Sequence, residues 1–227
     1  MTLSIDRFQL VVLESTTPTT TLAEEVRACL TAAPKRLPCR FFYDAAGSAI
    51  FDEICDLPEY YVTRAEREIL QEHAGAIAAL APQRCRLVEL GSGSASKTRL
   101  IIEALLQRQG TLRYIPVDIS RSALEESALP LLDRYTGLDI QAVAAEYQDG
   151  LRYLERASSG PKLILWLGSN VGNFERADAA AFLRQVRSTM TLEDRLLIGI
   201  DLRKDRSILE PAYDDAQGVT ARFNKNL

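Results

Sequence analysis

The sequence contains few side chains that bind transition metals. It has one histidine, His73, and four cysteines that lie far apart and form no CxxC pair. A structural zinc site needs four such ligands at close spacings, so no metal site is predicted. We expect the cysteines to be reduced and packed. His73 is expected on a helix surface, because it falls within the helical pattern of AEREILQEHAGAIAAL.

The chain also lacks an excess of basic charge and any long apolar run. Its net charge of -4 provides no electrostatic footprint for nucleic acid or for an anionic membrane. The longest apolar runs, such as LILWL and LLIGI, are too short to span a bilayer. The N-terminus lacks the basic start and long apolar core of a signal peptide. We therefore expect a cytoplasmic protein with neither nucleic acid nor membrane as a partner.

Strand-like and helix-like segments alternate from residue 83 to residue 202. Segments rich in leucine and β-branched residues predict five strands: RLVEL, LRYIPVD, IQAVAAEY, KLILWLG and RLLIGID. Amphipathic segments between them predict four helices: SKTRLIIEALLQRQ, RSALEESALPLLDRY, DGLRYLERA and FERADAAAFLRQVRSTM. This alternation is typical of a parallel sheet with helices on both faces, so the predicted fold is an α/β, Rossmann-like, doubly wound core.

Residues 1–82 predict a mainly helical segment that precedes this core. FQLVVL is expected to form a short edge strand, and the threonine-rich STTPTTT is expected to be a linker. Two capping boxes, Thr21 with Glu24 and Thr63 with Glu66, predict the starts of two helices.

The stretch LVELGSGSASKTRL joins an apolar strand to a helix through a glycine-rich turn. Three loops share this outline: the P-loop GxxxxGK(S/T), the dinucleotide-binding GxGxxG, and the loop of class I S-adenosylmethionine-dependent methyltransferases. Both phosphate-binding patterns need a glycine where Ser96 stands. The third has an acid before GxG and another after the second strand, which Glu89, Gly91, Gly93 and Asp118 match. The stretch therefore resembles the methyltransferase loop.

Longer segments carry a more specific resemblance. They are FYDAAGSAIFDEICDLPEYYVTRAEREIL, LVELGSGSASKTRLIIEAL, YIPVDIS, LGSNVGNF and DLRKDRSILEPAYDDAQGVTARFNKNL. Together, from about Arg36 to Leu227, they resemble the histidine Nα-methyltransferases of ergothioneine biosynthesis. The resemblance implies a class I core, a second domain that closes over an amino-acid substrate, and trimethylation of the α-amine of histidine with S-adenosylmethionine as cofactor.

The motif and the resemblance together imply the residues of the site. The cofactor-binding positions are Glu89, Gly91, Gly93, Lys97, Asp118, Glu146 and Tyr147. Tyr43 matches a mobile catalytic tyrosine near the cofactor, and Tyr60, Asn173 and Tyr213 match substrate-binding positions.

Some of these positions have a simpler reading or depart from the family. Asn173 is also a candidate N-cap for the helix that follows it, and Tyr60 or the adjacent Tyr61 is a candidate core aromatic. The family usually has Asp-Phe in place of Glu146-Tyr147, and threonine or serine in place of Asn170.

The resemblance also divides the chain and leaves its substrate open. It implies an N-terminal segment 1–82, a cofactor-binding core 83–202 and the start of a substrate-binding domain at 203–227. Only five core strands are recognised, whereas the class I sheet normally has seven, so we expect the last two strands and the imidazole contacts to lie beyond Leu227. An unpaired sheet edge predicts a homo-oligomer if the chain ends there. Histidine, another aromatic amino acid or related amine, and a catalytically inactive cofactor-binding module remain the alternatives.

Overall fold

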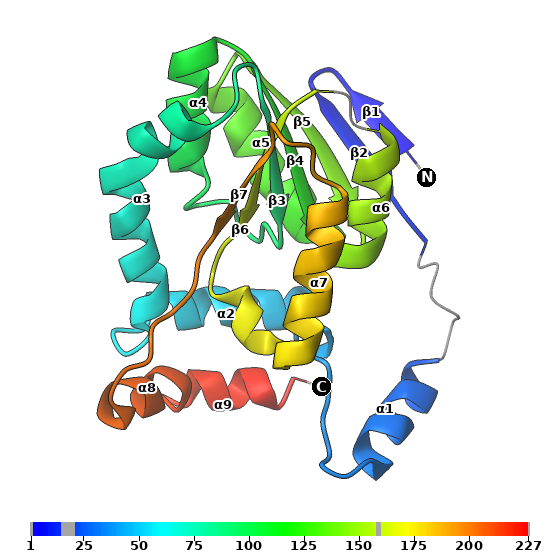
Figure 1. The fold of residues 1–227 in the computed structure, drawn as a ribbon. Coiled ribbons are helices and arrows are strands. Elements are labelled where there is room, and N and C mark those ends of the chain that lie inside the picture. The colour runs from blue at the N-terminus through cyan, green and yellow to red at the C-terminus, as the bar shows by residue number, and fades with distance from the viewer. Residues whose placement is uncertain (1, 15–20, 158–159, 227) are drawn as a thin grey trace.

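The computed structural model describes residues 2–14, 21–157 and 160–226, and a seven-stranded sheet lies at its centre (Figure 1). The strands are β1 (Thr2–Ile5), β2 (Phe8–Val12), β3 (Arg86–Leu90), β4 (Leu112–Asp118), β5 (Leu138–Ala144), β6 (Lys162–Trp166) and β7 (Arg195–Ile198). Their order is β1-β2-β5-β4-β3-β6-β7. Only β1 is antiparallel to its neighbour, so six strands form the parallel, doubly wound sheet that the sequence predicts.

Helices cover both faces of the sheet and one end of it. They are α1 (Leu22–Thr31), α2 (Ala45–Asp56), α3 (Tyr61–Leu80), α4 (Arg99–Gln109), α5 (Arg121–Arg134), α6 (Tyr147–Ala157), α7 (Arg176–Ser188), α8 (Arg206–Tyr213) and α9 (Val219–Asn224). Two short 3-10 helices are η1 (Cys39–Phe42) and η2 (Asn170–Asn173). Among the described residues no helix is both long and apolar enough to cross a membrane.

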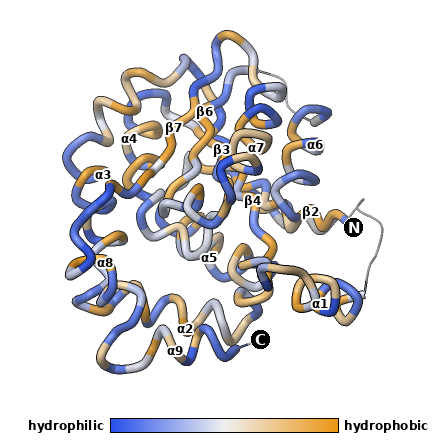
Figure 2. The backbone as a smooth tube through the Cα atoms, turned by 60° about the horizontal axis from the view of Figure 1, so that its bottom comes forward, coloured by the Kyte–Doolittle hydropathy of each residue, from blue (hydrophilic) through white to orange (hydrophobic). Residues whose placement is uncertain are grey.

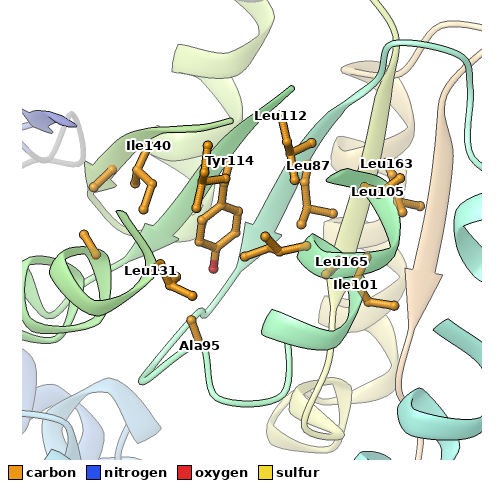
Figure 3. Close-up of a cluster of buried hydrophobic side chains, with 14 of the residues drawn as sticks. Leu87, Ala95, Ile101, Leu105, Leu112, Tyr114, Leu131, Ile140, Leu163 and Leu165 are labelled. Carbon is orange, nitrogen blue, oxygen red and sulfur yellow. The ribbon is translucent and has the colours of Figure 1, made fainter. Parts of the chain in front are cut away.

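The alternation of side chains along each strand creates two hydrophobic layers. In β3, Leu87 faces the layer formed with α3, α4 and α5, whereas Val88 faces the layer formed with α6 and α7. Figure 3 shows the first layer, in which Leu163 and Leu165 of the sheet lie beside Leu105 and Ile101 of α4. Because both faces are covered, most residues of the inner strands β3, β4, β5 and β6 are apolar and buried.

The N-terminal hairpin β1–β2 extends the sheet beyond the predicted core. The expectation that FQLVVL forms an edge strand is wrong, because β2 lies between β1 and β5. Arg7, in the turn of the hairpin, donates hydrogen bonds to the carbonyl oxygens of Leu132 and Tyr135 at 2.7 Å each and of Leu138 at 3.2 Å. This guanidinium therefore fastens the hairpin to the C-terminal end of α5. Residues 15–20 of the expected threonine-rich linker lie outside the described residues.

One of the two predicted capping boxes forms. Thr21 and Glu24 make both reciprocal hydrogen bonds at the start of α1. The second prediction is wrong: α3 begins at Tyr61, and the hydroxyl of Thr63 donates to the sulfur of Cys55 at 3.3 Å. The first turn of α3 is buried against α2, so the helix begins two residues before the N-cap that the sequence predicts. That leaves Glu66 free for a different contact.

A layer of helices lies at the carboxyl end of the strands (Figure 1). Here α2 and α9 run side by side (Figure 2), joined by an ion pair between Glu53 and Arg222. The side-chain amide of Asn226 also donates to Asp44 at 2.8 Å. The aromatic-rich segment before α3 therefore packs against residues that lie 169 to 182 positions later in the chain.

The histidine and the cysteines, which we did not expect to bind a metal, can now be placed in the structure. His73 is exposed on α3. Cys29, Cys39, Cys55 and Cys85 are all free thiols, as expected.

Candidate cofactor and substrate site

The site forms where the order of the strands reverses. β3 and β6 are neighbours in the sheet, but the chain continues from β3 to β4 on one side and from β6 to β7 on the other. The loops after β3 and β6 therefore diverge, and α/β proteins bind ligands in the crevice at this point. The glycine loop at 91–93 follows β3, and residues 167–170 follow β6.

Two glycines shape the loop after β3. Gly91 has φ +76 and Gly93 has φ +49, which are conformations that favour glycine. A Cβ on Gly91 would collide with the hydroxyl oxygen of Tyr147 and lie 3.4 Å from Nδ2 of Asn170. A Cβ on Gly93 would meet nothing within 4 Å. The loop is therefore packed tightly on its inner side and open on its outer side.

Asp118 closes the loop from the end of β4. Its Oδ2 accepts a hydrogen bond from the backbone N–H of Gly93 at 3.0 Å, and its Oδ1 accepts one from Ser120 at 2.9 Å. Burial raises the pKa of Asp118, and these backbone hydrogen bonds oppose the rise. Each oxygen retains a second lone pair. The carboxylate is therefore fixed beside the glycines and can still accept hydrogen bonds from two hydroxyl groups of a ligand.

Glu89 lies beneath the loop and is only 3% exposed. Its carboxylate accepts hydrogen bonds from the hydroxyls of Thr98, before α4, and Tyr114, in β4. Burial raises its pKa to about 7, although both hydrogen bonds favour the ionised form. Glu89 thus links the two ends of the loop to the sheet and supports it from below.

Glu146 and Tyr147 lie at the start of α6. The ring of Tyr147 packs against Trp166 and Phe182, with centroid distances of 6.5 and 5.5 Å. Its hydroxyl therefore reaches Gly91, and burial raises its pKa. Glu146 is half-exposed, with one oxygen 3.5 Å from Nε of Arg40. These contacts bring the segment before α2 to the outer end of β5.

Lys97 makes a contact that the sequence did not predict. Its ammonium forms an ion pair with Glu66 of α3, and Oε1 of Glu66 accepts the backbone N–H of Gly168 at 2.8 Å. The helical period could have revealed Glu66, because Val62 and Leu70, four residues to either side, are both buried. An acid on the apolar face of an amphipathic helix indicates a specific partner.

Three of the four predicted tyrosines, Tyr43, Tyr60 and Tyr213, come together in one aromatic cluster. Tyr60 lies 6.2 Å from Phe51 and 5.9 Å from Tyr213, measured between ring centroids. Tyr43 lies 5.5 Å from Phe51 and 5.4 Å from Phe223. The buried members of the cluster are Ile54, Leu57, Tyr60, Val62, Ala212, Val219 and Phe223. The structure thus joins positions 43, 60 and 213 across the full length of the chain.

The adjacent tyrosines 60 and 61 have different surroundings. Tyr60 is buried within the aromatic cluster, and burial raises its pKa. The hydroxyl of Tyr61 instead donates to Asp201, which follows β7, and the ammonium of Lys204 lies 4.6 Å from the centre of its ring. The backbone N–H of Asp201 donates to the hydroxyl of Ser169 at 3.0 Å. Tyr61 therefore connects α3 to the loops after β6 and β7.

The structure removes one alternative for Asn173. The N-cap of α7 is Glu175, so Asn173 does not cap that helix. It lies exposed at the end of η2, on the same loop as Asn170. The side chain of Asn170 donates to the carbonyl oxygen of Leu167 at 2.7 Å and lies between the two loops of the switch point. Contact of either asparagine with a substrate stays a prediction.

Solved structures of methyltransferases share the fold of this protein. A putative methyltransferase from Thermobifida fusca superposes with a TM-score of 0.56 at 16% identity, covering 81% of this chain and 72% of that one. The plantazolicin methyltransferase BpumL, solved with S-adenosylhomocysteine, superposes with a TM-score of 0.50 at 12% identity, covering 90% and 71%. At these identities the likeness concerns the fold, which with the acid–GxG loop and Asp118 defines a class I methyltransferase.

Sequence relatives define the family. The profile described as histidine-specific methyltransferase, SAM-dependent, matches residues 22–227, and the chain belongs to this family. It is 41% identical over 227 residues to the histidine N-alpha-methyltransferase of Mycolicibacterium smegmatis, spanning all of this chain and 68% of the relative. The Mycobacterium tuberculosis protein of the same name is 42% identical over 91% of this chain and 63% of its own length. The chain thus spans about two thirds of these relatives.

Proposed function

We propose that the protein transfers methyl groups from S-adenosylmethionine to the α-amine of histidine, giving N,N,N-trimethylhistidine on the route to ergothioneine. The main support for this proposal is that two regions of the chain lie together at the carboxyl end of the sheet. One is the glycine loop with Asp118, and the other is the cluster that contains Tyr43, Tyr60 and Tyr213. The names of the mycobacterial relatives support histidine as the substrate.

The residues of the glycine loop fit the proposed cofactor. The open side of Gly93 admits a ligand against the backbone, and Asp118 presents a carboxylate to the two hydroxyls of a ribose. Lys97 would hold the carboxylate of the methionine moiety, and Glu146 would lie beside the adenine. When bound, S-adenosylmethionine supplies an electrophilic methyl group on a sulfonium.

The aromatic cluster would hold and orient the amino acid. Tyr60, Asn173 and Tyr213 are the proposed substrate contacts, and Tyr43 would lie nearest the methyl group. Burial raises the pKa of Tyr43 and of Tyr60, so both phenols stay protonated at neutral pH and act as hydrogen-bond donors. Alignment of the amine with the methyl group lowers the barrier by about 7–11 kcal/mol in favourable cases.

Each transfer forms one N–C bond, breaks one C–S bond and requires the amine lone pair to be free. A methylated amine must therefore lose a proton before the next transfer. Because the tyrosines are protonated, we propose that water or a carboxylate takes this proton.

A second candidate substrate is another aromatic amino acid or a related amine. The 4-dimethylallyltryptophan N-methyltransferase easF of Aspergillus fumigatus is 31% identical over 91% of this chain and 62% of its own length. This relative shows that a protein of similar sequence carries the name of a different aromatic substrate. A catalytically inactive cofactor-binding module is the remaining alternative.

Mass spectrometry of the products tests the proposal. The protein is incubated with S-adenosylmethionine and, separately, with histidine, tryptophan, tyrosine and 4-dimethylallyltryptophan. We expect mono-, di- and trimethylated histidine to appear in succession. Methylation of another amine alone would contradict histidine as the substrate, and cofactor binding without any product would indicate the inactive module.

Two further expectations belong to this proposal. We place the reaction in the cytoplasm, in agreement with four free thiols in the structure. β7 pairs only with β6 among the described residues, so association of two copies through this edge stays a prediction, which light scattering would test.

A further inference from the structure

Glu66 joins three parts of the chain through one carboxylate. It projects from α3, forms an ion pair with Lys97 at the start of α4, and accepts the backbone N–H of Gly168 at 2.8 Å after β6. Its side chain is 12% exposed and that of Lys97 is 20% exposed. The two oxygens of Glu66 thus serve the two loops that diverge at the switch point of the sheet.

The surroundings of Glu66 leave little room for another side chain. Gly199, after β7, lies so close that a Cβ there would collide with Oε1 of Glu66. Val62 and Leu70 place Glu66 on the buried face of α3, where an apolar residue would pack without loss of hydration. Burying a carboxylate there costs free energy that the ion pair offsets only in part. A charge at this position therefore indicates a role other than packing.

The charge of Lys97 indicates what the carboxylate of Glu66 does. Lys97 lies one residue before Thr98, the N-cap of α4, where the helix dipole disfavours a cation and a nearby anion offsets that cost. With Glu66 present the pair is neutral. Without Glu66, the glycine loop would carry one uncompensated positive charge beside the ligand.

We propose that Glu66 is a positioning residue that holds Lys97 and Gly168 in place and favours the cationic cofactor over its product. S-adenosylmethionine carries an ammonium, a sulfonium and a carboxylate, for a net charge of about +1, whereas S-adenosylhomocysteine has lost the sulfonium and is neutral. The carboxylate of Glu66 therefore stabilises the reactant relative to the product. This inference rests on the proposed cofactor.

Four variants separate charge from structure. Glu66→Gln keeps an oxygen that can accept the N–H of Gly168 but removes the charge. Glu66→Ala removes both contacts, and Lys97→Met removes the cation while Glu66 remains. Glu72→Gln is the matched control, because it removes a carboxylate from an exposed position of the same helix.

The measurement is calorimetric titration of each variant with both S-adenosylmethionine and S-adenosylhomocysteine at one pH and low salt. In Glu66→Gln we expect the ratio of the two dissociation constants, reactant over product, to rise about tenfold. In Lys97→Met the ratio should fall, and in Glu72→Gln it should equal that of the wild type. Glu66→Ala should show the same rise, together with weaker binding of both ligands.

A merely structural role would weaken both ligands equally and leave the ratio unchanged, which would overturn the inference while the proposed function stands. If Glu66→Gln does not fold, Lys97→Met decides, because an unchanged ratio there also overturns it. Failure of the wild type to bind either ligand would overturn the proposed function and this inference with it.

Discussion

The glycine loop and the aromatic cluster both lie at the carboxyl end of the sheet but are built from different contacts. Around the loop, three carboxylates accept hydrogen bonds from the backbone or from buried side chains; they belong to Asp118, Glu66 and Glu89. In the aromatic cluster, rings pack at centroid distances of 5.3–6.2 Å, and Tyr213 remains 54% exposed. Directional hydrogen bonds fix the first region in one geometry, whereas ring contacts allow repacking. The rigid glycine loop therefore suits the proposed cofactor, which does not vary, and the adaptable aromatic cluster suits the proposed substrate.

The largest expected effect is that of Gly91→Ala on cofactor binding. Alanine at φ +76 costs about 1–2 kcal/mol, and its Cβ would displace Tyr147. We expect the affinity for S-adenosylhomocysteine to fall at least about 100-fold by calorimetry, as the loop shifts. Gly75→Ala is the control: it lies in α3 with nothing within 4 Å, and should stabilise the fold by about 0.5–1 kcal/mol. Unchanged binding by Gly91→Ala would show that the loop is not rigid.

The rigid region should also impose a pH dependence on stability through Glu89. Burial raises its pKa from 4.5 to about 7, so the folded protein holds this proton more tightly than the unfolded chain does. The stability from this group is present below about pH 4.5 and is lost as the pH rises through about 7. From about pH 4.5 to about pH 8, the wild type should lose up to about 3 kcal/mol of unfolding free energy relative to Glu89→Gln.

Urea denaturation across this pH range measures the difference. Glu72→Gln, an exposed carboxyl on α3, is the control and should track the wild type. Parallel curves for the wild type and Glu89→Gln would mean that folding does not raise the pKa of the Glu89 carboxyl group.

Asp118→Ala should have the next largest effect. Loss of a charge-assisted hydrogen bond to a ribose weakens binding of S-adenosylhomocysteine by about 1.5–3 kcal/mol. Asp118→Asn keeps the shape and one acceptor oxygen, so its loss should be smaller. Calorimetric titration measures both variants, and an unchanged dissociation constant in Asp118→Ala would place the ribose elsewhere.

The smallest effect is expected in the aromatic cluster. Tyr60→Phe keeps the ring contacts with Phe51 and Tyr213 and removes only a hydroxyl. One neutral hydrogen bond is worth about 0.5–1.5 kcal/mol, so the KM for histidine should rise about two- to tenfold. Binding of S-adenosylhomocysteine should not change. Initial rates at saturating cofactor provide the KM, and a change in cofactor affinity instead would contradict the division between the two regions.

Local patterns in the sequence were enough to predict the core of the fold. The strands β3 to β7 and the helices between them follow from their patterns of apolar residues, because strands covered by helices on both faces are rich in apolar residues. The glycine loop and Asp118 could be predicted for a related reason. Parallel strands end at one edge, so residues that follow successive strands come together without further information.

Other features depended on contacts between distant segments. The capping-box signal at Thr63 failed because burial of the first turn of α3 outweighs a local hydrogen bond, and Glu66 was freed for Lys97 and Gly168. Similarly, β2 is an inner strand because β1 pairs with one of its edges and β5, more than 120 residues away, pairs with the other. The sequence by itself determined the sheet and the acids at its carboxyl end, since these depend on periodicity and strand direction. The tertiary structure alone decided which buried charges meet, because an ion pair depends on the separation of atoms in space and leaves no periodic signal in the chain.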